Sequence, residues 1–128
     1  MTEIFKKLNF KAQNPVLVLE APKTFEAELD DMAAETSIHR TRNGRDTYAF
    51  AMGFAPMKAD FERLASALKE ATEADAVLWI AYPKKTSKRF SSDIDRDLCA
   101  QAAVAFCLKP VRQIALDDDW SALRYKRS

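Results

Sequence analysis

The loop after Pro83 holds the densest group of side chains that could bind a ligand. Its six residues supply four cations and two hydroxyls, Lys84, Lys85, Thr86, Ser87, Lys88 and Arg89. Ammonium, guanidinium and hydroxyl groups in one short loop can receive a phosphate or a carboxylate through charge-assisted hydrogen bonds. Downstream, the Arg96 guanidinium can hold such an anion bidentately, and Asp97 can orient a loop lysine. We therefore interpret this segment as a candidate anion site.

Aspartates near this loop support a second interpretation, in which the charges only serve the fold. Two groups are expected beside it, one at the start of a helix and one at the end of the following strand: Asp93, Asp95, Asp97, Asp117, Asp118 and Asp119. The first group complements the partial positive charge of a helix N-terminus. The second can pair with Arg96, and the lysines and aspartates would then neutralise one another in a solvated network. The sequence leaves both interpretations open.

The two tryptophans are expected to differ in role. Trp79 lies in the most apolar run of the chain and is expected in the core. Trp120 follows three aspartates at an expected hairpin turn, where it either folds back over the end of the sheet or forms an aromatic wall for a ligand. We therefore count Trp120 and its neighbour Asp117 among the candidate binding residues.

Catalytic and metal-binding patterns are weak in this chain. His39 is the only histidine, and no cysteine lies near it, whereas a zinc site takes three or four ligands. A Ser-His-Asp triad would have to use His39, and no nucleophile-elbow glycines support one. Ser87 beside Lys88 is too generic a pair to indicate a catalytic dyad. We predict no metal site and assign no catalytic residue from the sequence.

The two cysteines, Cys99 and Cys107, fall in one expected helix. Eight residues of helix separate them by about 12 Å, whereas a disulfide needs Cα atoms roughly 4.4–6.8 Å apart. We expect two unbridged thiols that pack as small core residues. Unbridged thiols fit a reducing compartment, so we expect a cytoplasmic protein.

Length, charge and glycine content set further limits. The chain has 128 residues, the usual size of one domain, and we expect residues 1–128 to form a single domain. A formal net charge of +1 gives no general attraction to nucleic acid or to an anionic membrane, and no apolar run could span a bilayer. Gly44 and Gly53 are the only glycines, too few for a dinucleotide fingerprint or a Walker loop. We therefore expect no cofactor.

Apolar periodicity predicts an alternation of strands and helices. Continuous apolar runs indicate buried strands, and apolar residues at three- and four-residue spacing indicate helices. The expected strands are Val16–Leu19, Ser37–Thr41, Thr47–Phe54, Ala76–Tyr82, Val111–Leu116 and Ser121–Lys126. The expected helices are a turn at Ile4–Leu8, then Phe25–Met32, Met57–Leu68 and Ile94–Cys107, the last capped by Ser91 or Ser92.

This order favours an α/β fold, a three-layer Rossmann-like sandwich around a mixed sheet of about six strands with a C-terminal antiparallel hairpin. The strand–helix repeats between Thr47 and Leu116 imply right-handed parallel crossovers, which bring the carboxyl ends of these strands to one edge. Pro22, Pro56 and Pro83 end strands ahead of helical segments. A tight hairpin at residues 43–44 would instead make the neighbouring strands antiparallel. An α+β, ferredoxin-like order with a C-terminal extension is therefore the alternative.

Three segments of the C-terminal half carry a recognisable pattern: Tyr82–Lys88 (YPKKTSK), Asp95–Asp97 (DRD) and Pro110–Arg124 (PVRQIALDDDWSALR). Together they resemble a family of short bacterial α/β proteins of unknown function, and Leu17–Pro22 fits the same family less closely. Many relatives would have glycine in place of Lys85, so this loop is more cationic than theirs. The resemblance implies no particular activity.

The last third also resembles the closing segment of methyltransferase-type Rossmann domains. An apolar strand, a helix, a strand and an antiparallel return strand follow one another there in that order. The resemblance concerns the fold alone, because the glycine-rich loop that would hold a nucleoside cofactor is missing and the first strand runs into Glu20, Ala21 and Pro22. It implies that any ancestral cofactor binding has been lost.

Three functions are compatible with the sequence. The leading hypothesis is a non-catalytic module that binds an anionic small molecule or an acidic protein surface through the loop cations and Arg96. The second is a small enzyme, a transferase-like relic at the same edge with Asp97 or Asp117 as a base. The third is a protein-binding or dimerising domain that uses Ser121–Lys126 as an exposed sheet edge. The missing glycine loops and the lone histidine favour the first, and neither a membrane nor a nucleic acid is expected as partner.

Overall fold

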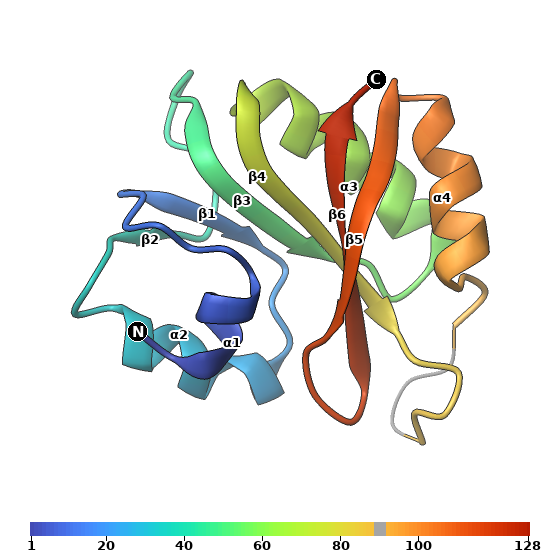
Figure 1. The fold of residues 1–128 in the computed structure, drawn as a ribbon, viewed down its shortest axis with the longest axis horizontal. Coiled ribbons are helices and arrows are strands. Elements are labelled where there is room, and N and C mark those ends of the chain that lie inside the picture. The colour runs from blue at the N-terminus through green and yellow to red at the C-terminus, as the bar shows by residue number, and fades with distance from the viewer. Residues whose placement is uncertain (89–91) are drawn as a thin grey trace.

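A mixed sheet forms the middle layer of the protein (Figure 1). In this computed structural model, residues 1–88 and 92–128 are described, and they form one six-stranded sheet with the order β2-β1-β3-β4-β6-β5. The strands are β1 (Val16–Leu19), β2 (Ile38–His39), β3 (Tyr48–Phe54), β4 (Thr72–Pro83), β5 (Leu108–Ala115) and β6 (Trp120–Arg127).

The strand directions confirm the Rossmann-like α/β class. β1 runs parallel to both β2 and β3, and β3 runs parallel to β4. β6 lies between β4 and β5 and is antiparallel to both, so β5 points the same way as β4. The carboxyl ends of β1 to β5 therefore meet at one edge of the sheet, which we call the carboxyl edge. The ferredoxin-like alternative is wrong, because β1 separates β2 from β3 and the turn at residues 43–44 closes no hairpin.

Helices cover both faces of the sheet and complete three layers (Figure 1). The helices are α1 (Glu3–Lys7), the 3-10 turn η1 (Lys23–Phe25), α2 (Glu26–Met32), α3 (Lys58–Ala71) and α4 (Arg96–Val104). α1 and α2 pack on one face, and α3 and α4 pack on the other. In the part of the chain that the structure describes, no helix is long and apolar enough to cross a bilayer.

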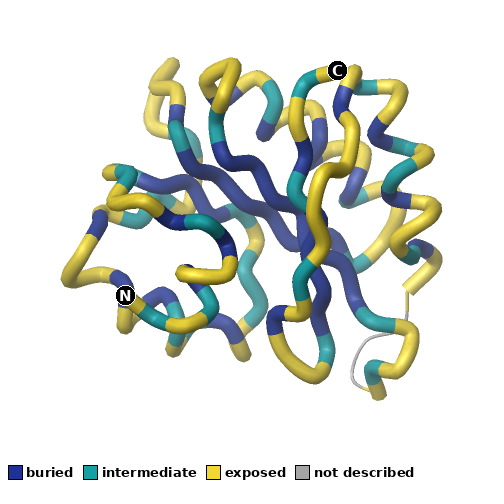
Figure 2. The backbone as a smooth tube through the Cα atoms, in the orientation of Figure 1, coloured by how far each residue is buried: buried dark blue, intermediate teal, exposed yellow. Residues whose placement is uncertain are grey.

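Side chains of the central strands alternate between these two faces, as a pleated strand requires. In β4, Leu78 and Ile80 pack with α3 and α4, whereas Trp79 packs with α1 and α2. Figure 2 shows β3 and β4 buried along most of their length. Trp79 is fully buried and its indole N–H donates to the Leu8 carbonyl at 2.8 Å, which confirms its place in the core. β3 and β6 flank β4 on both sides, as expected of a buried strand.

Several expected boundaries shift. The second strand shrinks from Ser37–Thr41 to two residues, and the last helix spans nine residues rather than fourteen. The carboxylate of Asp95 caps this helix by accepting from the Leu98 N–H at 3.0 Å, so Ser92 is not its cap. Ser91 lies outside the described residues. A carboxylate directly ahead of the helix supplies the acceptor that the free N–H groups of its first turn need.

The two cysteines also separate. Cys99 is buried on α4, whereas Cys107 lies beyond the helix, is exposed, and has a positive φ of 56°. Both are free thiols. The expectation that both are core residues of one helix is therefore wrong for Cys107, because α4 ends at Val104 and the chain turns there into β5.

The exposed edge of the sheet differs from the expected one as well. Ser121–Lys126 was expected at the edge, but β6 is paired with β4 on one side and with β5 on the other. β5 is the edge strand instead, and most of it is exposed. The turn at residues 117–119 folds β6 back between its two neighbours.

Candidate functional site

Two hollows open beside the loop that leaves β4 at the carboxyl edge. The first, which we call the edge hollow, has a volume of about 340 Å³ and is lined by Tyr82, Pro83, Lys84, Lys85, Thr86, Asp95, Arg96, Asp97, Gln113 and Ser121. The second, of about 370 Å³, is lined by Pro83, Lys84, Lys85, Ser87, Lys88, Ser92 and Ile94. The loop cations predicted from the sequence therefore stand between two hollows, and Arg96 and Asp97 join them at the first.

The loop is held against the hairpin between β5 and β6. Pro83, the last residue of β4, pairs with Trp120 in the sheet. The Lys84 N–H donates to the Asp119 carbonyl at 2.8 Å, and the Ser87 N–H donates to the Lys84 carbonyl at 3.0 Å. These bonds turn the chain directly after β4, so the lysines extend from a fixed starting point.

Three neutral polar residues from the sheet line the edge hollow. The Gln113 side-chain amide donates to the Tyr82 hydroxyl at 2.9 Å, and Ser121 faces Tyr82 in the register of β4 and β6. Burial raises the pKa of Tyr82, so its hydroxyl stays protonated and able to donate. Sequence reasoning missed all three residues, because their convergence depends on which strands are neighbours.

One of the cations at this hollow is neutralised by the fold. The Lys85 ammonium lies 3.1 Å from an Asp95 oxygen, and the pKa of Asp95 is lowered by the Leu98 N–H and by Lys85. Asp95 is thus committed to its helix and to Lys85. Arg96 contacts Asp97 at 3.5 Å, with both side chains more than half exposed. Within residues 1–88 and 92–128, Lys84 forms no ion pair.

Other candidate residues have structural roles. Asp117 accepts from the N–H groups of Asp119 and Trp120, each at 2.8 Å, which closes the hairpin turn. It lines neither hollow, and Arg96 does not pair with it. Trp120 is 2% exposed and packs edge-on against Phe54 with centroids 5.2 Å apart. The aromatic-wall interpretation of Trp120 is therefore wrong, since its ring covers the core.

The remaining residues of the loop lie in different places. Ser87 donates to an Asp119 oxygen at 2.8 Å, Thr86 lines the edge hollow, and Lys88 lines the second hollow. Asp93, expected to complement its own helix, instead accepts from the Lys58 N–H at 2.7 Å, at the start of α3. Arg89, the fourth cation of the loop, lies outside the described residues.

Neither a metal-binding group nor a reactive thiol is found at this edge within the described part of the chain. No group of three or more His, Cys, Asp or Glu residues that could hold a metal occurs among the described residues. His39 shares a hydrogen bond of 2.6 Å with the Tyr48 hydroxyl. Burial raises the pKa of the Cys99 thiol to about 12, which leaves it protonated and unreactive at neutral pH.

An ion pair lies at the switch point of the sheet. In open α/β sheets, ligands commonly bind where the strand order reverses, which is here between the carboxyl ends of β1 and β3. Arg63 on α3 pairs with Glu20, which follows β1, through Nη2 and Oε1 at 2.8 Å, and also with Asp60 at 3.0 Å. The glycine-rich loop that would cradle phosphates is absent from the sequence there.

Comparison with known proteins supports the fold and goes no further. No protein-family model and no curated protein matches the sequence. The ribosomal protein L11 methylase of Lactobacillus delbrueckii subsp. bulgaricus is similar with a TM-score of 0.58 and 9% identity over 98% of this chain and 76% of its own. The glycopeptide N-methyltransferase MtfA in complex with S-adenosylmethionine gives 0.60 and 10% over 97% and 91%. The mitomycin 7-O-methyltransferase MmcR gives 0.61 and 9% over 98% and 53%.

At such identities the similarity shows a shared architecture. It confirms the expected likeness to methyltransferase-type Rossmann domains, which here covers nearly the whole chain and not only its last third. Membership of the bacterial family of unknown function stays a prediction.

Proposed function

We propose that this protein binds a small anionic molecule in the edge hollow and that it does so without catalysing a reaction. The observation that carries the proposal is the pairing pattern of the charges. Lys85 and Asp95 neutralise each other, whereas Lys84 has no ion pair among the described residues and Arg96 has only a long, exposed contact with Asp97. Two cations are thereby left available at one hollow.

The size and lining of the hollow define the ligand class. Its volume of about 340 Å³ lies at the lower end of the range for small-molecule sites, about 300–1,000 Å³. Beside the cations, the Tyr82 hydroxyl, the Ser121 hydroxyl and the Gln113 amide offer neutral hydrogen bonds. A small phosphorylated or dicarboxylic compound with further hydroxyl groups matches this combination, and an apolar ligand does not.

A small enzyme at the same edge is the alternative, and S-adenosylmethionine is its natural probe because MtfA was solved with that ligand. The placement of the carboxylates favours a binding role. Asp97 is 77% exposed and contacts Arg96, and Asp117 is occupied by its own turn. Neither is held in the desolvated setting that prepares a carboxylate to act as a base. The Glu20–Arg63 pair at the switch point also disfavours a nucleoside cofactor.

The test is a thermal-shift screen with phosphate, nucleotides, dicarboxylates and S-adenosylmethionine. A ligand at 100 times its dissociation constant stabilises the native state by about 2.7 kcal/mol, which raises the melting temperature of a domain of this size by on the order of 10 °C. We expect one anion class to give such a shift, and Lys84→Ala and Arg96→Ala to abolish it. Arg45 lies in the turn before β3, at the opposite edge of the sheet, so Arg45→Ala should leave the shift unchanged.

Two outcomes would contradict this function. A uniform, salt-like shift in the native chain and in all three variants would leave the cations with a structural role only. Specific binding of S-adenosylmethionine that survives Lys84→Ala would favour the enzyme.

A further inference from the structure

One part of the sheet is left uncovered by the helical layers. Figure 1 shows α1 and α2 beside β1 and β3, while β5 and β6 lie at the front of the view with no described helix over them. Figure 2 shows β5 exposed along most of its length. Between Leu108 and Ala115 only Leu108 is buried and Ile114 is half-buried. A sheet face on which β5 and the end of β6 are open to solvent is therefore available to a partner.

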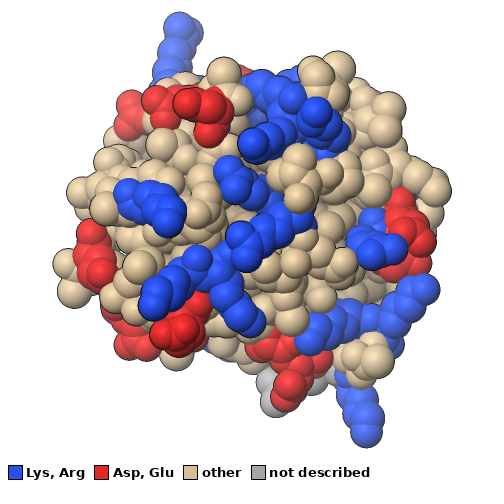
Figure 3. Space-filling model, in the orientation of Figure 1, with Lys and Arg blue, Asp and Glu red and all other residues tan. Residues whose placement is uncertain are grey.

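Four cations stand on this open face, and we call them the cation ladder: Lys109, Arg112, Arg124 and Lys126. Lys109 lies directly opposite Lys126, and Arg112 lies directly opposite Arg124. Arg124 is also paired with Trp79, whose ring packs with α1 and α2, so the ladder lies on that side of the sheet. Figure 3 shows Lys and Arg side chains gathered across the middle of this face.

The cation ladder is unfavourable for the isolated chain. Like charges directly opposite each other in a sheet destabilise it, and none of the four cations has an ion pair with any carboxylate of residues 1–88 and 92–128. The Arg124 Nε is buried and has no hydrogen-bond partner in the described structure. A bound carboxylate would relieve the repulsion between these cations.

The backbone of β5 is open on its outer side. β6 is the only strand that pairs with β5 among the described residues, so the outward N–H and C=O groups of β5 have no strand partner. Such an edge is a template for an added strand, except at Pro110, which has no N–H to donate. Beside it, a hollow of about 310 Å³ lies between α4 and β5, where Val111 is 44% exposed and Leu123 contributes apolar surface.

We propose that β5 binds an extended acidic segment of another protein as an added strand. Acidic side chains of that segment would lie over the cation ladder, and the intervening small apolar side chains would enter the hollow beside Val111. Lys109 and Arg112 are three residues apart in β5, but an irregularity between Pro110 and Arg112 places them opposite Lys126 and Arg124, which are two residues apart in β6. Alternate residues of a strand lie about 6.6–6.8 Å apart on one face, so an acid at every second position matches the spacing of the cation ladder. This surface is separate from the edge hollow, and the inference does not depend on the proposed function.

Two other occupants fit less well. A second copy of this chain paired through β5 would bring Lys109 and Arg112 of both copies together, which adds like-charge repulsion. Single-stranded nucleic acid binds by stacking bases on aromatic side chains as well as by its phosphates. No Phe, Tyr or Trp among residues 1–88 and 92–128 is exposed. An acidic peptide uses both the cations and the open backbone.

The test uses a ten-residue synthetic peptide that alternates glutamate and valine, with a lysine–valine peptide of the same length as its counterpart. We expect the native chain to bind only the acidic peptide, and the double variant Lys109→Glu with Arg112→Glu to weaken that binding at least tenfold, or about 1.4 kcal/mol. Lys23→Glu with Arg45→Glu makes the same change of net charge elsewhere and should bind normally. The Lys109→Glu, Arg112→Glu variant should in turn bind the lysine–valine peptide, which shows that it is folded.

A second measurement separates strand addition from attraction between charges alone. Two peptides would be compared, one methylated at the odd-numbered N–H groups and one at the even-numbered N–H groups. One of them should lose binding and the other should keep it, because only one set of N–H groups would face β5. Equal tolerance of both methylated peptides would overturn the proposal. So would tighter binding of an oligothymidylate of equal charge, or acidic-peptide binding that survives the Lys109→Glu, Arg112→Glu change.

Discussion

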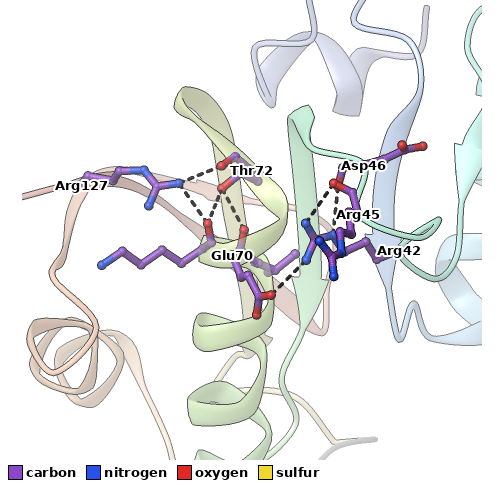
Figure 4. Close-up of polar contacts among 8 residues, drawn as sticks. Arg42, Arg45, Asp46, Glu70, Thr72 and Arg127 are labelled. Atoms are coloured by element: carbon purple, nitrogen blue, oxygen red, sulfur yellow. Dashed lines mark hydrogen bonds and ion pairs between the residues drawn. The ribbon is translucent and has the colours of Figure 1, made fainter.

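Arginines at the amino edge of the sheet bind the chain's own backbone, whereas the cations at the carboxyl edge face a hollow. Figure 4 shows the amino edge, where Arg127 donates to the carbonyls of Lys69 and Thr72 at 2.9 and 2.8 Å. Arg42 donates there to the Asp46 carbonyl at 2.9 Å and contacts Glu70 at 3.2 Å. At the carboxyl edge neither Lys84 nor Arg96 has a comparable set of bonds within the described chain.

The difference comes from what each edge offers. The last turn of α3 leaves carbonyl groups without helical partners, and Arg127 of β6 reaches two carbonyls at this junction because its strand ends beside the start of β4. At the carboxyl edge the helix that faces the cations begins rather than ends, so its free groups are N–H donors, and Asp95 already serves them. Cations of the same type therefore close the fold at one edge and remain available at the other.

The largest effect is expected from Arg127→Ala. This change leaves the carbonyls of Lys69 and Thr72 without their charged donor, and hydrogen bonds to charged groups are worth about 1.5–3 kcal/mol. We expect the free energy of unfolding to fall by about 2–3 kcal/mol, measured by urea denaturation. Arg45→Ala, which removes a cation whose side chain has no ion pair among the described residues, is the matched control and should change stability little. If Arg127→Ala lowered the free energy of unfolding no more than Arg45→Ala does, the arginine contacts at the amino edge would not stabilise the fold, and the proposed difference between the edges would be wrong.

Alkaline pH should lower the free energy of unfolding through the buried thiol of Cys99. Cys99 belongs to the same core cluster as Tyr82, and burial raises its pKa from 9.0 to about 12. The unfolded thiol loses its proton near pH 9 while the folded one keeps it, so the free energy of unfolding falls as pH rises from about 9 towards 12. Between pH 9 and 11 we expect Cys99 to contribute a loss on the order of 2 kcal/mol, and Cys99→Ala should reduce this slope without abolishing it, because burial also raises the pKa values of Tyr82 and Tyr125.

The exposed thiol supplies the check on that experiment. Cys107 should react with a thiol reagent in the native state, and Cys99 only after unfolding. Rapid native-state reaction of both thiols would show that α4 opens readily, and the alkaline slope could then not be ascribed to burial of Cys99.

Much of the fold could be predicted from local patterns. Local patterns correctly placed two strands and one helix, around Val16–Leu19, Val77–Ala81 and Met57–Leu68. The apolar residues of these segments, and their spacing, already indicate which side chains are buried. The position of β6 was not, because strand order is set by long-range packing. One signal was present: Pro110 within a polar strand indicates an edge, and it marks β5 as the open strand.

The candidate site divides in the same way. Lys84, Lys85 and Thr86 could be predicted, because adjacent residues of one loop stay together in any fold. Gln113 and Ser121 could not, since only the register of three strands brings them to Tyr82. Trp120 was left between two orientations, because the sequence does not show which way a side chain at a turn points, and its burial against Phe54 favours the one that folds back over the sheet.

The smallest expected change in stability concerns the cations of the carboxyl edge, and it tests the comparison of the two edges most directly. If the cations of the carboxyl edge are not needed for folding, Lys84→Ala combined with Arg96→Ala should change the free energy of unfolding by less than about 0.5 kcal/mol. Lys84 has no ion pair in the described chain, and the exposed contact of Arg96 with Asp97 is worth about 0–1 kcal/mol at most. Lys85→Ala is the internal reference, since it breaks the Asp95 contact at 3.1 Å and should cost slightly more. A loss as large as that of Arg127→Ala would mean that Lys84 and Arg96 stabilise the fold after all, and the anion proposal would lose its main support.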